Sequence, residues 1–127
     1  MSSTPVPPAT ASRTKPDPDL PRRLRAWLER LPEAQLPVTY QQAAEALGLV
    51  PPRTIQRVAL ALEALMREDA AAGRPLIAAL VVSRRGELPR PGFFELAVEL
   101  GRLPADSAAH ERAYRQEVKQ VLAARSE

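Results

Sequence analysis

Between positions 37 and 92 the sequence reads Pro37-Val-Thr-Tyr-Gln-Gln-Ala-Ala-Glu-Ala-Leu-Gly48, then Pro51-Pro-Arg-Thr-Ile-Gln-Arg-Val-Ala59, then Pro75-Leu-Ile-Ala-Ala-Leu-Val-Val-Ser-Arg-Arg-Gly86. This order predicts a short capped helix, a turn, a longer helix and a strand that ends in a basic turn. A helix-turn-helix followed by a wing has the same order of elements. We therefore expect a mainly α-helical fold with a small two-stranded β wing, a winged helix-turn-helix.

The two helices of this unit have recognisable ends. Thr39 and Gln42 are spaced as a capping box, and Gly48 is placed to end the short helix in a left-handed conformation. The longer helix is expected to open at Pro51-Pro52, because proline is favoured in a first helical turn. Its buried face follows helical spacing and comprises Ile55, Val58, Ala59, Leu62, Leu65 and Met66. Residues 76–83 and 88–93 are the expected wing strands.

The rest of the chain is expected to flank this unit. Residues 1–18 are rich in Pro, Ser and Thr and poor in large apolar residues, which predicts a disordered N-terminal arm. Residues 19–104 would form the winged domain, with helices also at about 20–31 and 94–100. Residues 105–127 would form a C-terminal helix that packs on the domain or in a dimer interface. A homodimer is considered because Leu60, Ala61 and Ala64 would extend an apolar outer face.

The composition narrows the class of protein. The chain has 127 residues, a net charge of +3 and no cysteine, and no stretch approaches the roughly 18 consecutive apolar residues of a membrane span. We therefore expect a cytoplasmic protein without disulfides. Nearly all basic residues are arginine, whose planar fork suits phosphates and guanine edges. A GC-rich genome would produce the same arginine bias.

Catalytic groups are scarce. His110 is the only histidine, the acidic residues are scattered, and no glycine-rich phosphate loop is present. The sequence also offers no typical metal-binding motif, because it has no cysteine and only one histidine. We therefore expect no enzyme, no metal and no cofactor.

Binding residues are easier to propose. In a helix-turn-helix, the start of the second helix enters the major groove, and here it carries Arg53, Thr54, Gln56 and Arg57. Flanking backbone contacts would come from Tyr40, Gln41 and Gln42, and phosphate or minor-groove contacts from Arg84 and Arg85 at the wing tip. Any solvated surface helix can show such a polar face. The expected partner is double-stranded DNA, with RNA as an open alternative.

Parts of residues 37–93 also resemble a known family. The stretch from Val38 to Gly48, the Pro-Pro-Arg-Thr-Ile start and the stretch from Pro75 to Val82 resemble the DNA-binding domain of alkylguanine-DNA alkyltransferases and of the non-enzymatic alkyltransferase-like proteins. The resemblance implies a winged helix-turn-helix that binds the minor groove and flips a nucleotide. It matches Tyr40 to the tyrosine that rotates the nucleotide and Arg53 to the arginine that replaces it in the base stack.

The resemblance fails at the reactive segment. The family's Pro-Cys-His-Arg-Val falls on Ala78-Ala-Leu-Val-Val82, so the acceptor cysteine, its histidine and its arginine are absent. The sequence thus predicts a non-catalytic DNA-binding protein, such as a bacterial transcriptional regulator or a nucleoid- or phage-associated factor. Two alternatives stay open. One is a protein–protein adaptor on the same scaffold, and the other is an alkyltransferase-like repair accessory, which would need a pocket beside Tyr40.

Overall fold

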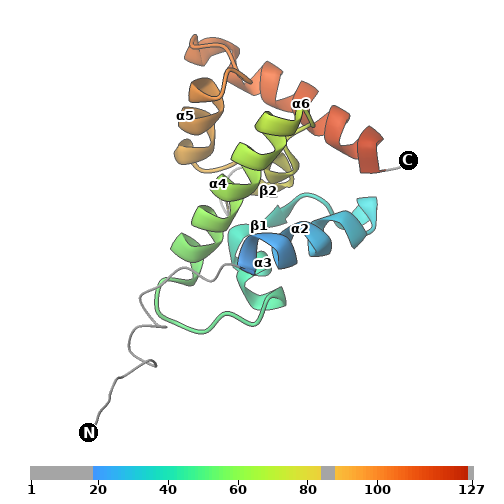
Figure 1. Ribbon diagram of the computed structural model, residues 1–127, viewed down its shortest axis with the longest axis vertical. Coiled ribbons are helices and arrows are strands. Elements are labelled where there is room, and N and C mark those ends of the chain that lie inside the picture. The colour runs from blue at the N-terminus through green and yellow to red at the C-terminus, as the bar shows by residue number, and fades with distance from the viewer. Residues whose placement is uncertain (1–18, 84–87, 126–127) are drawn as a thin grey trace, which may run out of the picture.

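The computed structural model describes residues 19–83 and 88–125 (Figure 1). Its α-helices are α2 (Leu20–Arg30), α3 (Tyr40–Ala46), α4 (Thr54–Ala72), α5 (Pro91–Glu99) and α6 (His110–Arg125), and short 3-10 helices are η1 (Glu33–Gln35), η2 (Ile77–Leu80) and η3 (Ser107–Ala109). Two strands, β1 (Val38–Thr39) and β2 (Val81–Val82), complete the fold. The chain is therefore mainly helical with a small β component. The expected disordered arm, residues 1–18, lies outside the described residues.

Helix α4 is the centre of the molecule. It crosses the view of Figure 1 diagonally and contacts α2, α3, α5 and η2. Four members of its predicted buried stripe are buried, namely Val58, Leu62, Leu65 and Met66, while Ile55 and Ala59 are half-buried. The helical spacing of apolar residues thus predicted correctly which face of α4 meets the core.

The boundaries of α3 agree with the sequence, and the start of α4 does not. The Thr39 hydroxyl accepts a hydrogen bond from the Gln42 backbone N–H at 3.0 Å, and the Gln42 side chain accepts one from the Thr39 N–H at 2.8 Å. Gly48 is left-handed at φ +72°, as expected. Helix α4, however, begins at Thr54 rather than at Pro51-Pro52. The second proline disfavours a helical conformation at the first, and residues 51–53 form bends instead.

The β structure differs from the expected hairpin. Strands β1 and β2 pair in parallel, with Val38 opposite Val81 and Thr39 opposite Val82. Of the expected strand 76–83, residues 77–80 form the 3-10 helix η2, and the expected second strand gives way to α5 at Pro91. Ser83 donates a backbone hydrogen bond to Leu88 at 2.8 Å, and residues 84–87 between them lie outside the described part of the chain.

Two buried carboxylates explain why the chain turns at η2. Asp69 of α4 accepts the Ile77 N–H at 3.0 Å, and Glu117 of α6 accepts the Leu76 N–H at 2.6 Å. These two successive N–H groups are thus occupied by carboxylates from two different helices. This favours a turn here, because the same N–H groups cannot also form hydrogen bonds with a neighbouring β-strand. Asp69, which the sequence suggested was one of several scattered acids, is completely buried.

Arginine side chains neutralise these carboxylates. Asp69 lies 2.9 Å from the Arg25 guanidinium and 3.0 Å from that of Arg74, and Glu117 lies 3.1 Å from that of Arg102. A buried carboxylate needs such partners to be tolerated.

Helix α6 packs on η2 through these contacts and others. The Tyr114 hydroxyl donates to the Ala79 carbonyl at 2.7 Å, and Arg125 donates to the carbonyl of Leu31 at the end of α2. Among the described residues, no helix combines the length and the apolar character that crossing a bilayer requires.

Candidate nucleic-acid interface

Arg53 occupies the position just before α4. Its backbone is left-handed at φ 63°, and its side chain is exposed. Within residues 19–83 and 88–125 the guanidinium has no hydrogen bond or ion pair. Thr54 follows as the first helical residue and is half-buried. Arg53 therefore presents its charge to solvent at a helix N-terminus, where the backbone N–H groups also favour an anion.

Arg57 does not accompany Arg53 into solvent. It is half-buried, and its guanidinium donates to the Val50 carbonyl at 3.1 Å. The carbonyl belongs to the connection between α3 and α4, so Arg57 ties that connection to the second turn of α4. Gln56, by contrast, is exposed. Of the residues predicted at the start of this helix, Arg53 and Gln56 are available for binding.

The expected contacts at the start of α3 are mostly committed within the helix. Gln42 is occupied by the capping box, and the Gln41 side chain donates to Glu45 at 3.0 Å. The other two predicted residues, Arg84 and Arg85, lie outside the described residues.

Tyr40 is buried and faces the start of α5. Its hydroxyl accepts the Arg90 N–H at 3.3 Å, and the Arg90 guanidinium carbon lies 5.7 Å from the centre of its ring. Burial raises the pKa of Tyr40, an effect that the Arg90 N–H and charge partly offset. The hydroxyl therefore stays protonated and keeps its hydrogen for donation.

A cavity of about 410 Å³ lies beside Tyr40, between α4 and the start of α5. Its walls are mostly apolar, and four side chains bring polar atoms to it: Tyr40, Gln56, Glu63 and Arg90. The Glu63 carboxylate lies near Gly92, 4.0 Å from where a β-carbon would stand. The full lining is Tyr40, Gln56, Ala59, Leu60, Leu62, Glu63, Met66, Arg90, Pro91, Gly92 and Phe93.

Two of the four polar residues of this cavity, Glu63 and Arg90, were not predicted as site residues from the sequence. Glu63 lies seven positions after Gln56 and so on the same face of α4, a spacing that could have revealed it. Arg90 had no such signal, because it meets Tyr40 across fifty positions of the chain. The segment Ala78-Ala-Leu80, which offered no polar partner to a ligand, is buried and does not line the cavity.

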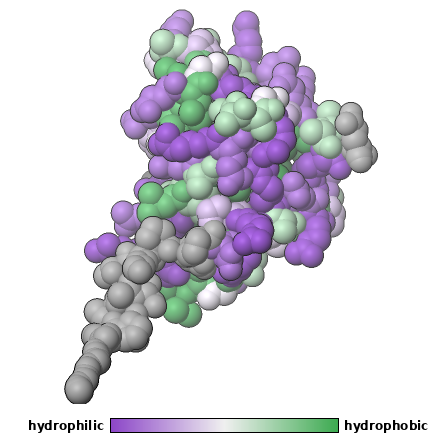
Figure 2. All heavy atoms as spheres, in the orientation of Figure 1, coloured by the Kyte–Doolittle hydropathy of each residue, from purple (hydrophilic) through white to green (hydrophobic). Residues whose placement is uncertain are grey.

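The apolar outer face expected on α4 is smaller than predicted. Leu60 is 53% exposed, but Ala61 is buried and Ala64 is half-buried. Figure 2 shows apolar side chains in small patches separated by hydrophilic ones on the face in view. Val50, at 68%, is the other large exposed hydrophobic residue of the described chain. The case for a homodimer at residues 60–64 is correspondingly weaker.

Several other arginines have structural partners. Arg23, Arg102 and Arg125 donate to the backbone carbonyls of Leu47, Arg74 and Leu31 respectively. Carbonyls at or beyond helix ends are unsatisfied by the helix itself, so these arginines supply the missing donors. Part of the arginine excess therefore stabilises the fold.

The only histidine also has a packing role. The His110 ring stacks on Phe94 with centres 5.4 Å apart, and its Nε2 lies 2.8 Å from the Pro104 carbonyl oxygen. In the part of the chain that the structure describes, no three carboxylate or imidazole groups gather as they would around a metal ion.

Comparisons with protein-family models, with curated proteins and with solved structures give no match for this chain. The resemblance of residues 37–93 to alkyltransferase DNA-binding domains therefore stays a prediction.

Proposed function

We propose that the chain is a DNA-binding protein of the winged-helix class, in which α3, the connection at 47–53 and α4 act as the helix-turn-helix. The start of α4 would face the duplex. The observation that supports this most is the exposed guanidinium of Arg53 at a helix N-terminus, which has no partner among the described residues, with the exposed amide of Gln56 one turn further along.

The chemistry of these groups fits a nucleic acid. A guanidinium binds a phosphate or forks onto guanine, and a glutamine amide forms paired hydrogen bonds with adenine. Arg57 would have a positioning role, because its bond to Val50 fixes the connection that presents Arg53.

Substitution of Arg53 tests this proposal. Arg53→Ala should weaken binding to a mixed-sequence duplex by about 1–3 kcal/mol, the usual cost of a lost base contact. Fluorescence anisotropy at low salt would measure it. The matched control is Arg112→Ala, which removes the same charge from an exposed position on α6. Equal losses in both variants would mean that only net charge matters, and an unchanged affinity for Arg53→Ala would refute the proposed interface.

The adaptor alternative predicts a different response to salt. A protein that neutralises several phosphates loses duplex affinity with a log–log slope of roughly −0.9 for each phosphate. For the wild type we expect a slope that corresponds to several neutralised phosphates. A flat response, or no duplex affinity at low salt, would favour a protein–protein adaptor.

The cavity beside Tyr40 supports a second candidate function. An alkyltransferase-like repair accessory needs a pocket next to this tyrosine, and the polar groups of Glu63, Gln56 and Arg90 could hydrogen-bond to a base that leaves the stack. A duplex with one O6-methylguanine should then bind more tightly than the intact duplex, and Glu63→Gln should change that preference. Equal affinity for the two duplexes would dismiss this candidate and leave the first one standing.

A further inference from the structure

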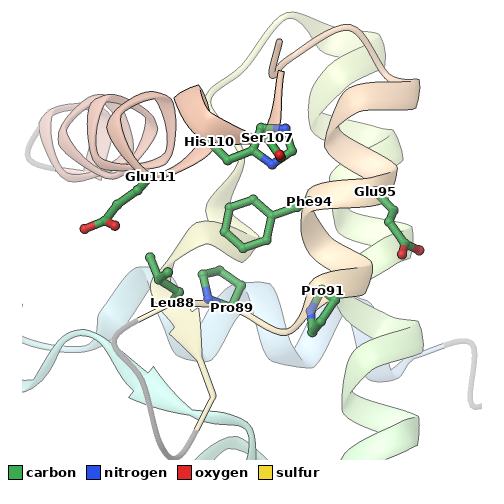
Figure 3. A pocket seen from close by; sticks show the side chains of 8 residues that line it. All are labelled: Leu88, Pro89, Pro91, Phe94, Glu95, Ser107, His110 and Glu111. Atoms are coloured by element: carbon green, nitrogen blue, oxygen red, sulfur yellow. The ribbon is translucent and has the colours of Figure 1, made fainter. Parts of the chain in front are cut away.

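A second hollow of about 460 Å³ lies on the other side of the first turn of α5, between α5 and the start of α6. Figure 3 shows the Phe94 ring at its centre, with Glu95 of α5 on one side and Glu111 of α6 on the other. We call this site the Phe94 hollow. Its lining is Leu88, Pro89, Pro91, Phe94, Glu95, Ser107, His110 and Glu111.

The floor of the hollow is apolar and its aromatic ring is well supported. Phe94 is half-buried, with His110 stacked nearly parallel to it at 7° and Phe93 packed edge-on at 5.3 Å. Leu88, Pro89 and Pro91 lie around the ring (Figure 3). An aromatic face held in this way can accept a cation or an apolar group.

Two carboxylates lie at the rim, those of Glu95 and Glu111. Both carboxylates of the described lining belong to exposed residues, one on each side of the ring and each from a different helix, and in Figure 3 both side chains extend away from the ring. Glu111 already holds the Arg115 guanidinium at 2.7 Å, whereas Glu95 has no ion pair or hydrogen bond among the described residues. An acidic rim disfavours a phosphate, so this side of α5 does not suit the DNA backbone.

We infer that the Phe94 hollow binds an arginine side chain of a partner protein, with an apolar residue of the same segment on Leu88 and the prolines. The guanidinium would stack on Phe94, and the exposed Glu95 side chain would turn toward the ring to pair with it. Arginine fits better than lysine because its planar group stacks on a ring and forks onto a carboxylate. The mixture of an apolar floor and an acidic rim favours a peptide over a simple polyamine, which has no side chain for the floor. This inference does not depend on DNA binding.

Amide chemical-shift mapping of the full chain tests it, with the peptide acetyl-Leu-Arg-Leu-amide as the probe. Titration should shift the resonances of residues 88–95 and 107–111 at millimolar peptide. The same peptide with neutral citrulline in place of arginine should bind at least about twofold more weakly, since it keeps the shape and loses the charge. Glu95→Gln should weaken the arginine peptide by about two- to fivefold, within the range of an exposed ion pair.

Two variants separate this inference from general electrostatics and packing. Glu99→Gln removes another exposed carboxylate one turn further along α5, outside the hollow, and should leave the affinity unchanged. Phe94→Leu keeps apolar volume but removes the aromatic face, so it should weaken peptide binding. Glu95→Gln should keep the native spectrum of the free protein. Equal affinity of the citrulline and arginine peptides, equal effects of the two glutamate variants, or shifts of these resonances by duplex DNA rather than by the peptide would overturn the inference.

Discussion

At the scale of single residues, the same side chain has opposite roles at neighbouring positions. Arg53 and Arg57 both lie at the start of α4, yet one is exposed and the other is bound to the Val50 carbonyl. The sequence could place both on the polar side of the helix, because helical spacing decides that. It could not show which guanidinium meets an unsatisfied carbonyl, because that depends on the path of the connection before the helix.

Asp69 is the residue whose loss should damage the fold most. Its carboxylate is fully buried, pairs with two arginines and accepts the Ile77 N–H. Asp69→Ala leaves those groups without a partner and should lower the free energy of unfolding by about 3–5 kcal/mol. The neighbouring Glu68→Ala removes an exposed carboxylate 3.2 Å from the same Arg25 and should cost no more than about 1 kcal/mol. Urea denaturation measures both, and similar losses would contradict the assigned role of Asp69.

Tyr114 should make stability depend on alkaline pH. Burial raises its pKa from 10.0 to about 12, so the unfolded chain loses this proton before the folded one does. The stabilising effect is complete below about pH 10 and is lost as the pH rises from 10 to 12. The free energy of unfolding should therefore be lower at about pH 11 than at about pH 9. Tyr114→Phe should lower stability at pH 9, because the bond to the Ala79 carbonyl is lost, and should reduce the fall between the two pH values. An unreduced fall in the variant would show that other groups cause it.

At the scale of elements, local signals predicted helices well and strands poorly. Thr39, Gln42 and Gly48 define α3 through contacts between near neighbours, and such contacts are visible in a sequence. The segment at 76–83 has the composition of a strand, but its conformation is set by carboxylates from α4 and α6. Those contacts span up to 41 positions, so no local pattern could have revealed the η2 turn.

A single side chain, Arg57, helps to position a whole element, because its hydrogen bond to the Val50 carbonyl fixes the connection between α3 and α4. Arg57→Ala should lower the free energy of unfolding by about 1–2 kcal/mol, as a charged donor is lost from a carbonyl. Amide hydrogen exchange in residues 47–53 should become faster. If Arg57 only positions Arg53, Arg57→Ala should bind DNA more weakly with an unchanged salt slope. Arg53→Ala should reduce the magnitude of the slope by about 1, the contribution of one phosphate contact. A slope reduced equally in both would give Arg57 a direct contact.

At the scale of the whole molecule, the mainly helical class followed from the sequence and the arrangement of the candidate sites did not. The cavity beside Tyr40 joins residues of α3, α4 and the start of α5, and the Phe94 hollow joins α5 to α6. The small sheet is parallel and connects the segment before α3 to the segment after η2, a pairing across the fold that alternation of side chains could not predict.

The most direct test of the proposed DNA interface is a map of amide chemical shifts of the full chain during titration with a mixed-sequence duplex. We expect the largest changes at residues 53–57 and around Tyr40, with α6 unaffected, and loss of these changes in Arg53→Ala. Changes concentrated on α6, or no changes at low salt, would contradict the account.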